Sequence, residues 1–551
     1  MKRHLVYRHI KMPKSVKQQF LSSICQISIQ FENYFYKQEV FSFKSKGDIL
    51  KIRKSIQFYK DIIFSYFLSL SKTCIIKHVG LYVLFLFSFS VTSCESFVDV
   101  GSPTNRIDQS LVFTNNATAT AAIYGIYNQM TNPNGFSSGG GRSMSVIGGL
   151  SSDDLNLYSA SLTQQKEFYL NTISATNTLL SSSIWGELYQ YIYKSNAMLE
   201  GLENSSGVSQ LLKNQLMGEA KFIRAFSYFY LVNLFGEVPM VITTDYRVNA
   251  SIPRTSITDI YKLIIADLKA SQVLLQDNYS LFKEERVRIN KFASIALLSR
   301  VYLYLGDWNN AEVSATEVIN NTTTYTLLSD LNSVFLKNSK EAIWQLSQDN
   351  SNTADAITHI FKTNPVTYAL SQNLITNFEP GDLRRSSWIG STTVGIANYY
   401  FPNKYKVTAT TPISEYSMVL RLGEQYLIRA EARINQPGKI SGGIEDLNLL
   451  RKRARALPTS AVPNPLPALS SSLSKEEALL AIERERRVEL FTEWGHRWLD
   501  LKRTNRANAT MGIVTPQKGG AWKPEWQLYP IPQVQILNDP AMTNAQNPGY
   551  N

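Results

Sequence analysis

The sequence predicts a mainly α-helical fold, in which pairs of helices support a loop-rich insert that forms the ligand face. Apolar residues recur at helical spacing through most of the chain after residue 113. Residues 293–320 have the pattern of two helices joined by a tight turn at Gly306 and Asp307. Residues 321–420 lack this periodicity and hold short strand-like pieces. Because loops on a rigid scaffold usually carry recognition, we expect ligands to bind at this insert.

A short apolar run precedes the predicted fold. It covers residues 81–91, follows Lys72 and Lys77, and ends in small residues directly before Cys94. A membrane-spanning helix needs about 20 apolar residues, and this run is shorter. We therefore interpret it as the hydrophobic core of a signal peptide.

The end of this run, residues 91–94 (VTSC), resembles the bacterial lipobox, in which cleavage occurs before a cysteine that carries lipid. We expect a leader over residues 1–93, a lipid on Cys94, and a lipidated tether over residues 94–112. The part before the signal peptide, residues 1–74, has two interpretations. It is either an over-extended gene model, which we favour, or a genuine long leader.

The excess of basic charge lies in this leader. Residues 1–93 hold 15 of the 56 Lys and Arg residues but 4 of the 44 Asp and Glu residues, which leaves 41 basic and 40 acidic residues from Cys94 onwards. The mature protein is therefore close to neutral, and a nucleic-acid partner has little electrostatic support. Cleavage removes Cys25 and Cys74, so we expect no disulfide and no cysteine-based metal site.

Helical patterns follow one another along the mature chain. They cover residues 113–130, 183–202, 210–235, 256–275, 291–305, 424–456 and 476–503, the last as one amphipathic helix. Gly236 and Pro239 end the third of these segments. Residues 132–161 are dense in Gly, Ser and Asn, which predicts a long loop.

The predicted hairpin at residues 293–320 resembles a tetratricopeptide unit, in which small residues let two antiparallel helices approach and a glycine makes the turn. Residues 424–456 repeat this pattern weakly, because their turn NQPGKISGG is longer than the repeat allows. For both segments, an ordinary helical hairpin is the alternative interpretation.

Three separated motifs point to a family. They are RAFSYFYLVNLFGEVPM, the Glu- and Arg-rich EEALLAIERERRVELFTEWGHRWLDLKR, and a tail that runs from YPIP to NPGY. In this order they resemble the SusD/RagB family of Bacteroidetes outer-membrane lipoproteins over nearly the whole mature chain. We expect the matching residues to support the fold, since Arg and Glu at i, i+4 spacing suit a helix docked on a core. These residues are Arg224, Gly236, Pro239, Glu485, Arg486, Arg487, Glu489, Glu493, Arg497, Trp498, Asp500, Leu501, Arg503 and Asn547 to Tyr550.

The resemblance implies a SusD-like domain over residues 113–551, with tetratricopeptide-like helical pairs and a loop-rich insert at residues 321–420. It also implies a lipid anchor in the outer membrane, an outward-facing protein, and delivery of nutrient to a SusC-like TonB-dependent transporter. Glu95 and Asp99 look like the surface-export signal of such lipoproteins. Family ligands are usually glycans, and some members bind peptides. Two hypotheses therefore remain, a glycan-binding lipoprotein and a peptide-binding or scaffolding RagB-like interaction protein.

Catalytic motifs are missing from the sequence. Its one G-x-S-x-G string, GFSSG at residues 135–139, lies inside the glycine- and serine-rich run and not between a predicted strand and a predicted helix, as a nucleophile elbow would. The same run lacks the lysine and the context of a phosphate loop. Only His359 and His496 remain after Cys94, which argues against a histidine metal site. We expect a protein that is not an enzyme and has no cofactor or metal.

Glycan binding would rely on aromatic stacking, because the C–H faces of sugars pack on Trp and Tyr rings while polar side chains bond the hydroxyl groups. Aromatic residues in irregular, polar surroundings are the best candidates. They are Trp388, Tyr399, Tyr400 and Phe401 in the insert, and Tyr158 with Asp153 and Asp154 in the long loop. For each aromatic residue the alternative is packing onto the helices, and for the two acids it is capping of the loop. Trp185, Trp308, Trp494 and Trp498 lie on predicted helices and are expected in the core.

Overall fold

The computed structural model of the protein describes residues 109–348, 351–361 and 366–550. The predicted leader, Cys94 and most of the predicted tether lie outside these residues. Within the described part, no helix has the length and apolar character needed to cross a membrane.

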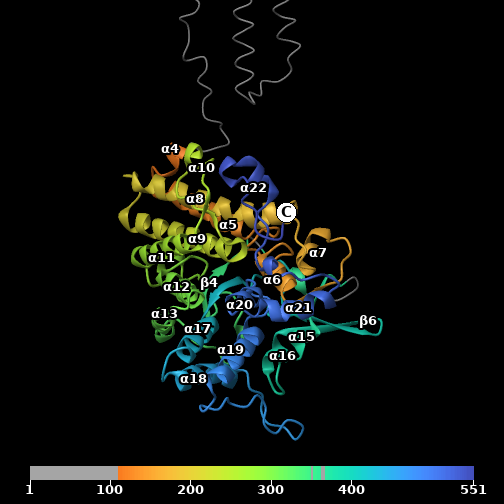
Figure 1. Cartoon of the computed structure of the whole chain (residues 1–551). Helices are drawn as coiled ribbons and strands as arrows, with labels where there is room; N and C mark the ends of the chain where they lie inside the picture. The colour runs from red at the N-terminus through yellow and green to blue at the C-terminus, as the bar shows by residue number, and fades with distance from the viewer. Residues whose placement is uncertain (1–108, 349–350, 362–365, 551) are drawn as a thin grey trace, which may run out of the picture. The chain divides into compact units, whose positions relative to one another are not determined.

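The predicted helical pairs form one continuous stack. Each helix contacts the next, and α13 contacts α17 although the insert separates them in the sequence. Figure 1 shows the stack along one side of the molecule, from α8 down to α18. The predicted mainly α-helical fold is therefore confirmed. The stack consists of α8 (Glu187–Glu203), α9 (Gln210–Phe235), α11 (Ile257–Leu274), α12 (Lys291–Leu305), α13 (Trp308–Asn320), α17 (Leu422–Ile434) and α18 (Ile440–Arg453).

The turn between α12 and α13 is the one that the sequence predicts. Gly306 ends α12 with a φ of 70°, and the side chain of Asp307 accepts a hydrogen bond from the backbone N–H of Asn310. The turn between α17 and α18 is shorter than predicted, because Gly443 lies inside α18. A Cβ atom at Gly443 would lie 2.7 Å from the carbonyl oxygen of Ala430, so this glycine lets the two helices approach.

The single helix predicted over residues 476–503 is wrong. The structure has α19 (Lys475–Leu490), a break, and α20 (His496–Arg503). Within the break, Trp494 and Gly495 have positive φ angles of 48° and 69°, which no α-helix accommodates. The apolar spacing continues across the break, and this hid it from the sequence analysis.

The long loop predicted over residues 132–161 contains α6 (Met144–Ser151) and β1 (Leu155–Leu157), so this prediction is only partly correct. The α6 helix is buried along its whole length. A Cβ atom at Gly148 would lie 2.5 Å from the Cα atom of Gly495, in the break between α19 and α20. Gly148, one of the glycines that suggested a loop, instead lets α6 pack closely against the break between α19 and α20.

The insert over residues 321–420 contains short strands, as predicted, together with three short α-helices that the sequence did not predict. Antiparallel pairs join β4 (Ala342–Leu346) to β8 (Ser417–Arg421), β1 to β5 (Tyr368–Leu370), and β6 (Ile389–Val394) to β7 (Ala397–Pro402). The short helices of the insert are α14 (Ala354–His359), α15 (Gln372–Ile375) and α16 (Leu383–Ser387). The hairpin of β6 and β7 extends sideways from the body (Figure 1).

Further elements surround the stack. The side chain of Asn115 caps the helix that begins at Asn116, by accepting bonds from the backbone N–H groups of Ala117 and Thr118. The other elements are α4 (Gln109–Val112), α5 (Asn116–Met130), α7 (Thr163–Tyr169), a π-helical turn (Leu180–Gly186), β2 (Val238–Pro239) paired with β3 (Arg254–Thr255), α10 (Tyr246–Asn249), α21 (Ala507–Gln517) and α22 (Gln533–Asn538).

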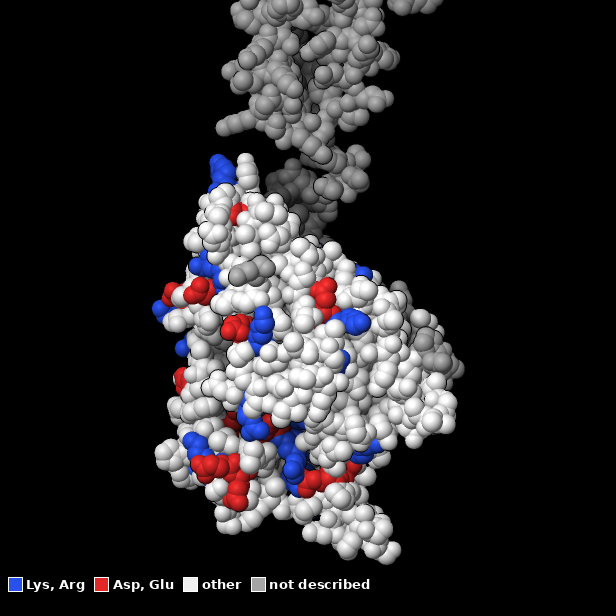
Figure 2. Space-filling view, turned by 45° about the vertical axis from the view of Figure 1, so that its right-hand side comes forward, with Lys and Arg blue, Asp and Glu red and all other residues white. Residues whose placement is uncertain are grey.

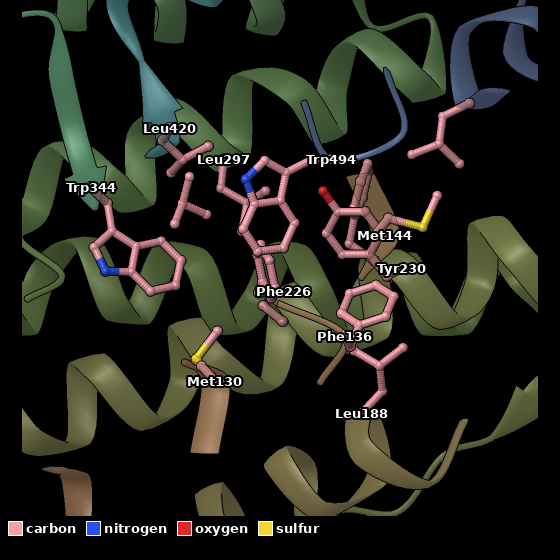
Figure 3. Packing of buried hydrophobic residues seen from close by; sticks show 14 of the residues in the cluster. Met130, Phe136, Met144, Leu188, Phe226, Tyr230, Leu297, Trp344, Leu420 and Trp494 are labelled. Carbon is pink, nitrogen blue, oxygen red and sulfur yellow. The ribbon is translucent and has the colours of Figure 1, made fainter. Parts of the chain in front are cut away.

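The aromatic core lies where α9 meets β4 and the break before α20. The Phe226 ring lies 5.7 Å from the Trp344 ring and 5.4 Å from the Trp494 ring, both edge to face. Figure 3 shows Phe136 and Tyr230 beside them. Such pairs add about 0.5–1.5 kcal/mol each to the burial of the rings. Trp185, Trp494 and Trp498 are buried as predicted, whereas Trp308 is only half-buried.

Candidate ligand-binding site

Two of the predicted aromatic residues, Tyr158 and Tyr399, meet on the surface although they are far apart in the sequence. Their ring centroids lie 5.1 Å apart and their planes are perpendicular. Tyr158 is 50% exposed, and Tyr399 is half-buried. An edge-to-face pair leaves ring surface open to solvent, on which the C–H face of a sugar can pack.

Strand pairing explains why these two residues meet. In the β1 and β5 pair, Leu157 lies opposite Tyr368, and β7 contacts β5. The residue after β1 therefore lies next to β7. The β6–β7 hairpin closes with a two-residue turn in which Gly395 has a φ of 64°. Two-residue hairpin turns need such a positive φ at their first central position.

Polar groups surround the tyrosine pair. Asn156 shares a face of the extended chain with Tyr158, and Tyr169 of α7 donates a long hydrogen bond of 3.5 Å from Oη to Asn156 Oδ1. Thr392 lies directly opposite Tyr399 in the hairpin. Burial raises the pKa of Tyr158 and of Tyr169, so both phenols remain proton donors at neutral pH.

Asn156, Tyr169 and Thr392 were missed by the sequence analysis. The alternation of strand residues could have suggested Asn156, because it lies two positions before Tyr158. The pairing of β6 with β7 could have suggested Thr392, since ANYYFP follows the turn signal VG. Nothing in the sequence places α7 beside β1.

The other two predicted aromatic residues of the hairpin do not join the pair. Strand alternation turns Tyr400 to the opposite face from Tyr399, where the Arg385 guanidinium lies 4.6 Å from the ring centroid. Phe401 is 8% exposed, and its ring lies 5.0 Å from the ring of Phe361. Phe401 therefore fastens the hairpin to the body and offers little surface to a ligand.

Trp388 is a core residue, and the prediction that its ring is open to a ligand is wrong. The side chain is 0% exposed, and its Nε1 donates a hydrogen bond of 2.9 Å to the carbonyl oxygen of Leu331. The ammonium of Lys404 lies 5.0 Å from the ring centroid. The surrounding sequence DLRRSSWIGST suggested a surface loop because it is polar, but two of its charged residues, Asp382 and Arg384, are themselves buried.

The prediction of Asp153 and Asp154 as ligand contacts is also wrong, because both side chains point into the protein. Arg497 Nε lies 2.7 Å from Asp153 Oδ1, and Arg487 Nε lies 3.2 Å from Asp154 Oδ1. Burial raises the pKa of Asp153, but the charges of Arg487 and Arg497 outweigh it and lower this pKa to about 2. Burial raises the pKa of Asp154. The two acids hold their loop against α19 and α20.

A buried ion-pair network holds the insert against α18 and α19. Arg384 of α16 donates to Asp382, Glu485 and Glu489, and Arg421 of β8 donates to Glu489 and Glu493. This network joins the insert to α18 and α19, which confirms that the family residues on α19 support the fold. Its members are Glu341, Asp382, Arg384, Lys404, Arg421, Arg451, Arg453, Glu485, Glu489 and Glu493, and none has a side chain more than 8% exposed.

Two family models match this chain. One, described as starch-binding and associating with the outer membrane, matches residues 116–303, and the SusD family model matches residues 367–550. Together they cover more than half of the sequence. The chain belongs to the SusD/RagB family.

Relatives and solved structures agree with this family. SusD-like protein P25 of Formosa agariphila is 24% identical over 558 residues, which cover 86% of this chain and 99% of that protein. SusD-like protein P2 of the same organism is 27% identical over 441 residues, which cover 70% and 84%. The match to this chain therefore covers most of the length of both relatives.

Solved SusD structures share the fold. A laminarin-binding SusD-like protein superposes with a TM-score of 0.64 at 24% identity, covering 80% of this chain and all of that one. A SusD superfamily protein from Bacteroides vulgatus also gives 0.64, at 21% identity, with coverages of 78% and 98%. Within the described residues, no group of three or more His, Cys, Asp or Glu side chains is placed to hold a metal ion.

Proposed function

We propose that this protein is an outer-membrane lipoprotein that binds a glycan at the cell surface and passes it to a SusC-like TonB-dependent transporter. The observation that carries the binding role is the exposed Tyr158 and Tyr399 pair, with amide and hydroxyl groups beside it. The starch-binding description of one matching family model and the laminarin-binding SusD neighbour support the same role.

The proposed anchor is a lipid on Cys94. Fourteen residues lie between Cys94 and Gln109, the first described residue, and the fifteen steps of a fully extended chain span at most about 50 Å. Such a tether keeps the binding domain within reach of a transporter in the same membrane. Replacing Cys94 with Ser should release the protein from the membrane fraction.

Binding without cleavage is part of the proposal. A glycosidase places two carboxyl groups about 5–9.5 Å apart on either side of the scissile bond. The acids nearest to Tyr158 in the sequence, Asp153 and Asp154, are occupied by Arg487 and Arg497. The segments that build the tyrosine pair, residues 155–165, 366–378 and 386–403, contain no carboxylate side chain.

Affinity electrophoresis and calorimetry with a panel of polysaccharides and peptides test this function. The purified protein, a Tyr158→Ala/Tyr399→Ala variant and a Tyr193→Ala control are compared. Tyr193 lies on α8 and is 51% exposed, so it matches Tyr158 in exposure. We expect one glycan to retard the wild type and the control but not the double variant. Heat with peptides alone would favour the RagB-like peptide-binding alternative, and release of reducing sugar would contradict binding without cleavage.

A further inference from the structure

The segments that build the tyrosine pair are unusual in their charge. Residues 155–165, 366–378 and 386–403 contain β1, β5, β6, β7 and the loops beside them, and they hold no Asp, Glu, Lys, Arg or His. At the 18% charged content of the whole chain, these 42 residues would hold about eight charged side chains. The side chains that they offer to solvent are instead hydroxyl, amide, aromatic and apolar groups, among them Ile396 in the hairpin turn, which is fully exposed.

The surface repeats this pattern. Figure 2 turns forward the side of the molecule that carries α7 and the β6–β7 hairpin in Figure 1. Charged side chains gather along one edge and at the lower end, while most of the remaining face is white.

Two cations that lie over aromatic rings beside the tyrosine pair, Lys518 and Arg385, are already engaged elsewhere. Lys518 lies 4.9 Å from the ring of Tyr169, but its ammonium donates to the carbonyl oxygens of Leu150 and Ser152. Burial also lowers the pKa of Lys518 to about 7, so part of the population is uncharged at neutral pH. Arg385 lies on Tyr400, on the face of the hairpin away from Tyr399.

Two exposed cations lie on neighbouring elements. Lys166 is in α7, and Arg142 precedes α6. In the described residues, neither is among the cations that lie over an aromatic ring, whereas Lys518 and Arg385 are. Within the segments that carry the Tyr158 and Tyr399 rings, a ligand meets hydroxyl, amide, aromatic and apolar groups and no charged side chain.

We propose that the Tyr158 and Tyr399 surface selects a neutral glycan and rejects one that carries sulfate or uronate groups. This inference rests on the proposed glycan-binding function. Proteins that recognise sulfate or carboxylate groups place Arg or Lys against them, because charge-assisted bonds replace the lost hydration. A sulfate on the two rings loses part of its hydration and meets no cation within the segments that carry them. A neutral sugar loses hydrogen bonds with water, and the Asn, Thr and Tyr groups replace them with bonds of their own.

Matched pairs of polymers test the selection. Starch, laminarin and dextran are each compared with their chemically sulfated forms by calorimetry against the purified protein. We expect at least one neutral polymer to bind, its sulfated form to bind at least tenfold more weakly, and the neutral Kd to change less than about twofold between 50 and 500 mM NaCl. The Tyr158→Ala/Tyr399→Ala variant should lose this binding.

A charge introduced on one face of the hairpin sharpens the test. Thr392→Lys places a cation on the face of Tyr399, and Ser391→Lys places the same charge on the opposite face as a control. We expect only Thr392→Lys to gain binding of the sulfated polymer, and to lose that gain at high salt. Wild-type binding of a sulfated polymer as tightly as its neutral form, abolished by the tyrosine substitutions, would overturn the inference and leave the glycan-binding function standing. Binding of no polymer of either kind would overturn both.

Discussion

The buried ion-pair network is rich in charged side chains, whereas the surface around Tyr158 and Tyr399 has none in the segments that build it. The network places five acidic and five basic side chains in the interior, each bonded to a partner. The tyrosine surface faces solvent with no charged residue in the segments that build it. The comparison shows that the charges of this network position the insert, while the proposed ligand face offers rings, amides and hydroxyl groups.

The stability of the protein is sensitive to the removal of a single charged side chain from this network. Desolvation of two charges offsets much of their mutual attraction, so a buried pair adds little net stability. Removing one partner leaves the other charge buried and uncompensated, which costs about 3–5 kcal/mol. A substitution at the solvent-exposed tyrosine surface has no such penalty.

The largest expected effect follows from Glu489→Gln. Glu489 bonds Arg384, Arg421 and Arg453, so its loss leaves three buried guanidinium groups short of a counter-charge. We expect the free energy of unfolding to fall by about 3–5 kcal/mol in urea denaturation. The control is Asp245→Asn, which removes a surface ion pair with the exposed Arg247 and should leave stability unchanged. A loss below about 1 kcal/mol for Glu489→Gln would contradict the role given to the network.

Acid should destabilise the interior and spare the binding surface. Burial lowers the pKa of His496 from 6.5 to about 4, so the unfolded chain binds a proton between these pH values that the folded chain does not. Stability from this group is therefore present above about pH 6.5 and is lost as the pH falls towards 4, by about 3 kcal/mol in total. Thermal unfolding from pH 7 to 4 should show this loss, and His496→Gln should reduce it.

The affinity for glycan, unlike the stability of the fold, should not depend on pH. Residues 155–165, 366–378 and 386–403 hold no group that titrates between pH 5 and 8. Lys518 has a pKa of about 7 and lies beside Tyr169, but its ammonium donates to the backbone carbonyl oxygens of Leu150 and Ser152. We expect the Kd for a neutral glycan to stay constant over that range, and a steep change would show that a titrating group takes part.

Trp388→Phe should separate stability from binding. The substitution removes the Nε1 bond to Leu331 and leaves that carbonyl without its partner, which costs about 1–3 kcal/mol. Glycan affinity of the folded variant should equal that of the wild type. A tenfold loss of affinity with unchanged stability would restore Trp388 as a ligand residue.

The smallest effect on stability is expected from Tyr399→Ala. Tyr399 is half-buried on an extended hairpin, so unfolding free energy should change by less than about 0.5 kcal/mol. Its loss removes one aromatic face worth about 0.5–1.5 kcal/mol, which lowers glycan affinity about two- to twelvefold by calorimetry. Tyr400→Ala, on the opposite face, is the matched control and should retain affinity.

The sequence predicted the helical stack well because each helix carries its own signal. Apolar spacing and the caps at Gly236 and Gly306 are local, and the structure has them where they were expected. The break before α20 was not predictable in this way, since it depends on the contact of Gly495 with Met144 and Gly148.

The candidate site was predicted only in part for the same reason. Tyr158 and Tyr399 were both named, but their contact depends on β1, β5 and β7 lying side by side. Trp388, Asp153 and Asp154 have polar neighbours in the sequence, and distant arginine and lysine side chains decide that they are buried. Local polarity could not distinguish an exposed loop from one held by ion pairs.

Hydrogen–deuterium exchange with and without a bound glycan tests the central claim most directly, because it locates the ligand without a substitution. The protein is measured alone and saturated with the neutral polymer that binds best. We predict slower exchange in residues 155–158 and in β6 and β7, with α18 and α19 unchanged. Protection confined to another part of the described chain, such as the cleft lined by Val232, Tyr261 and Leu528, would contradict the assignment of the ligand face to Tyr158 and Tyr399.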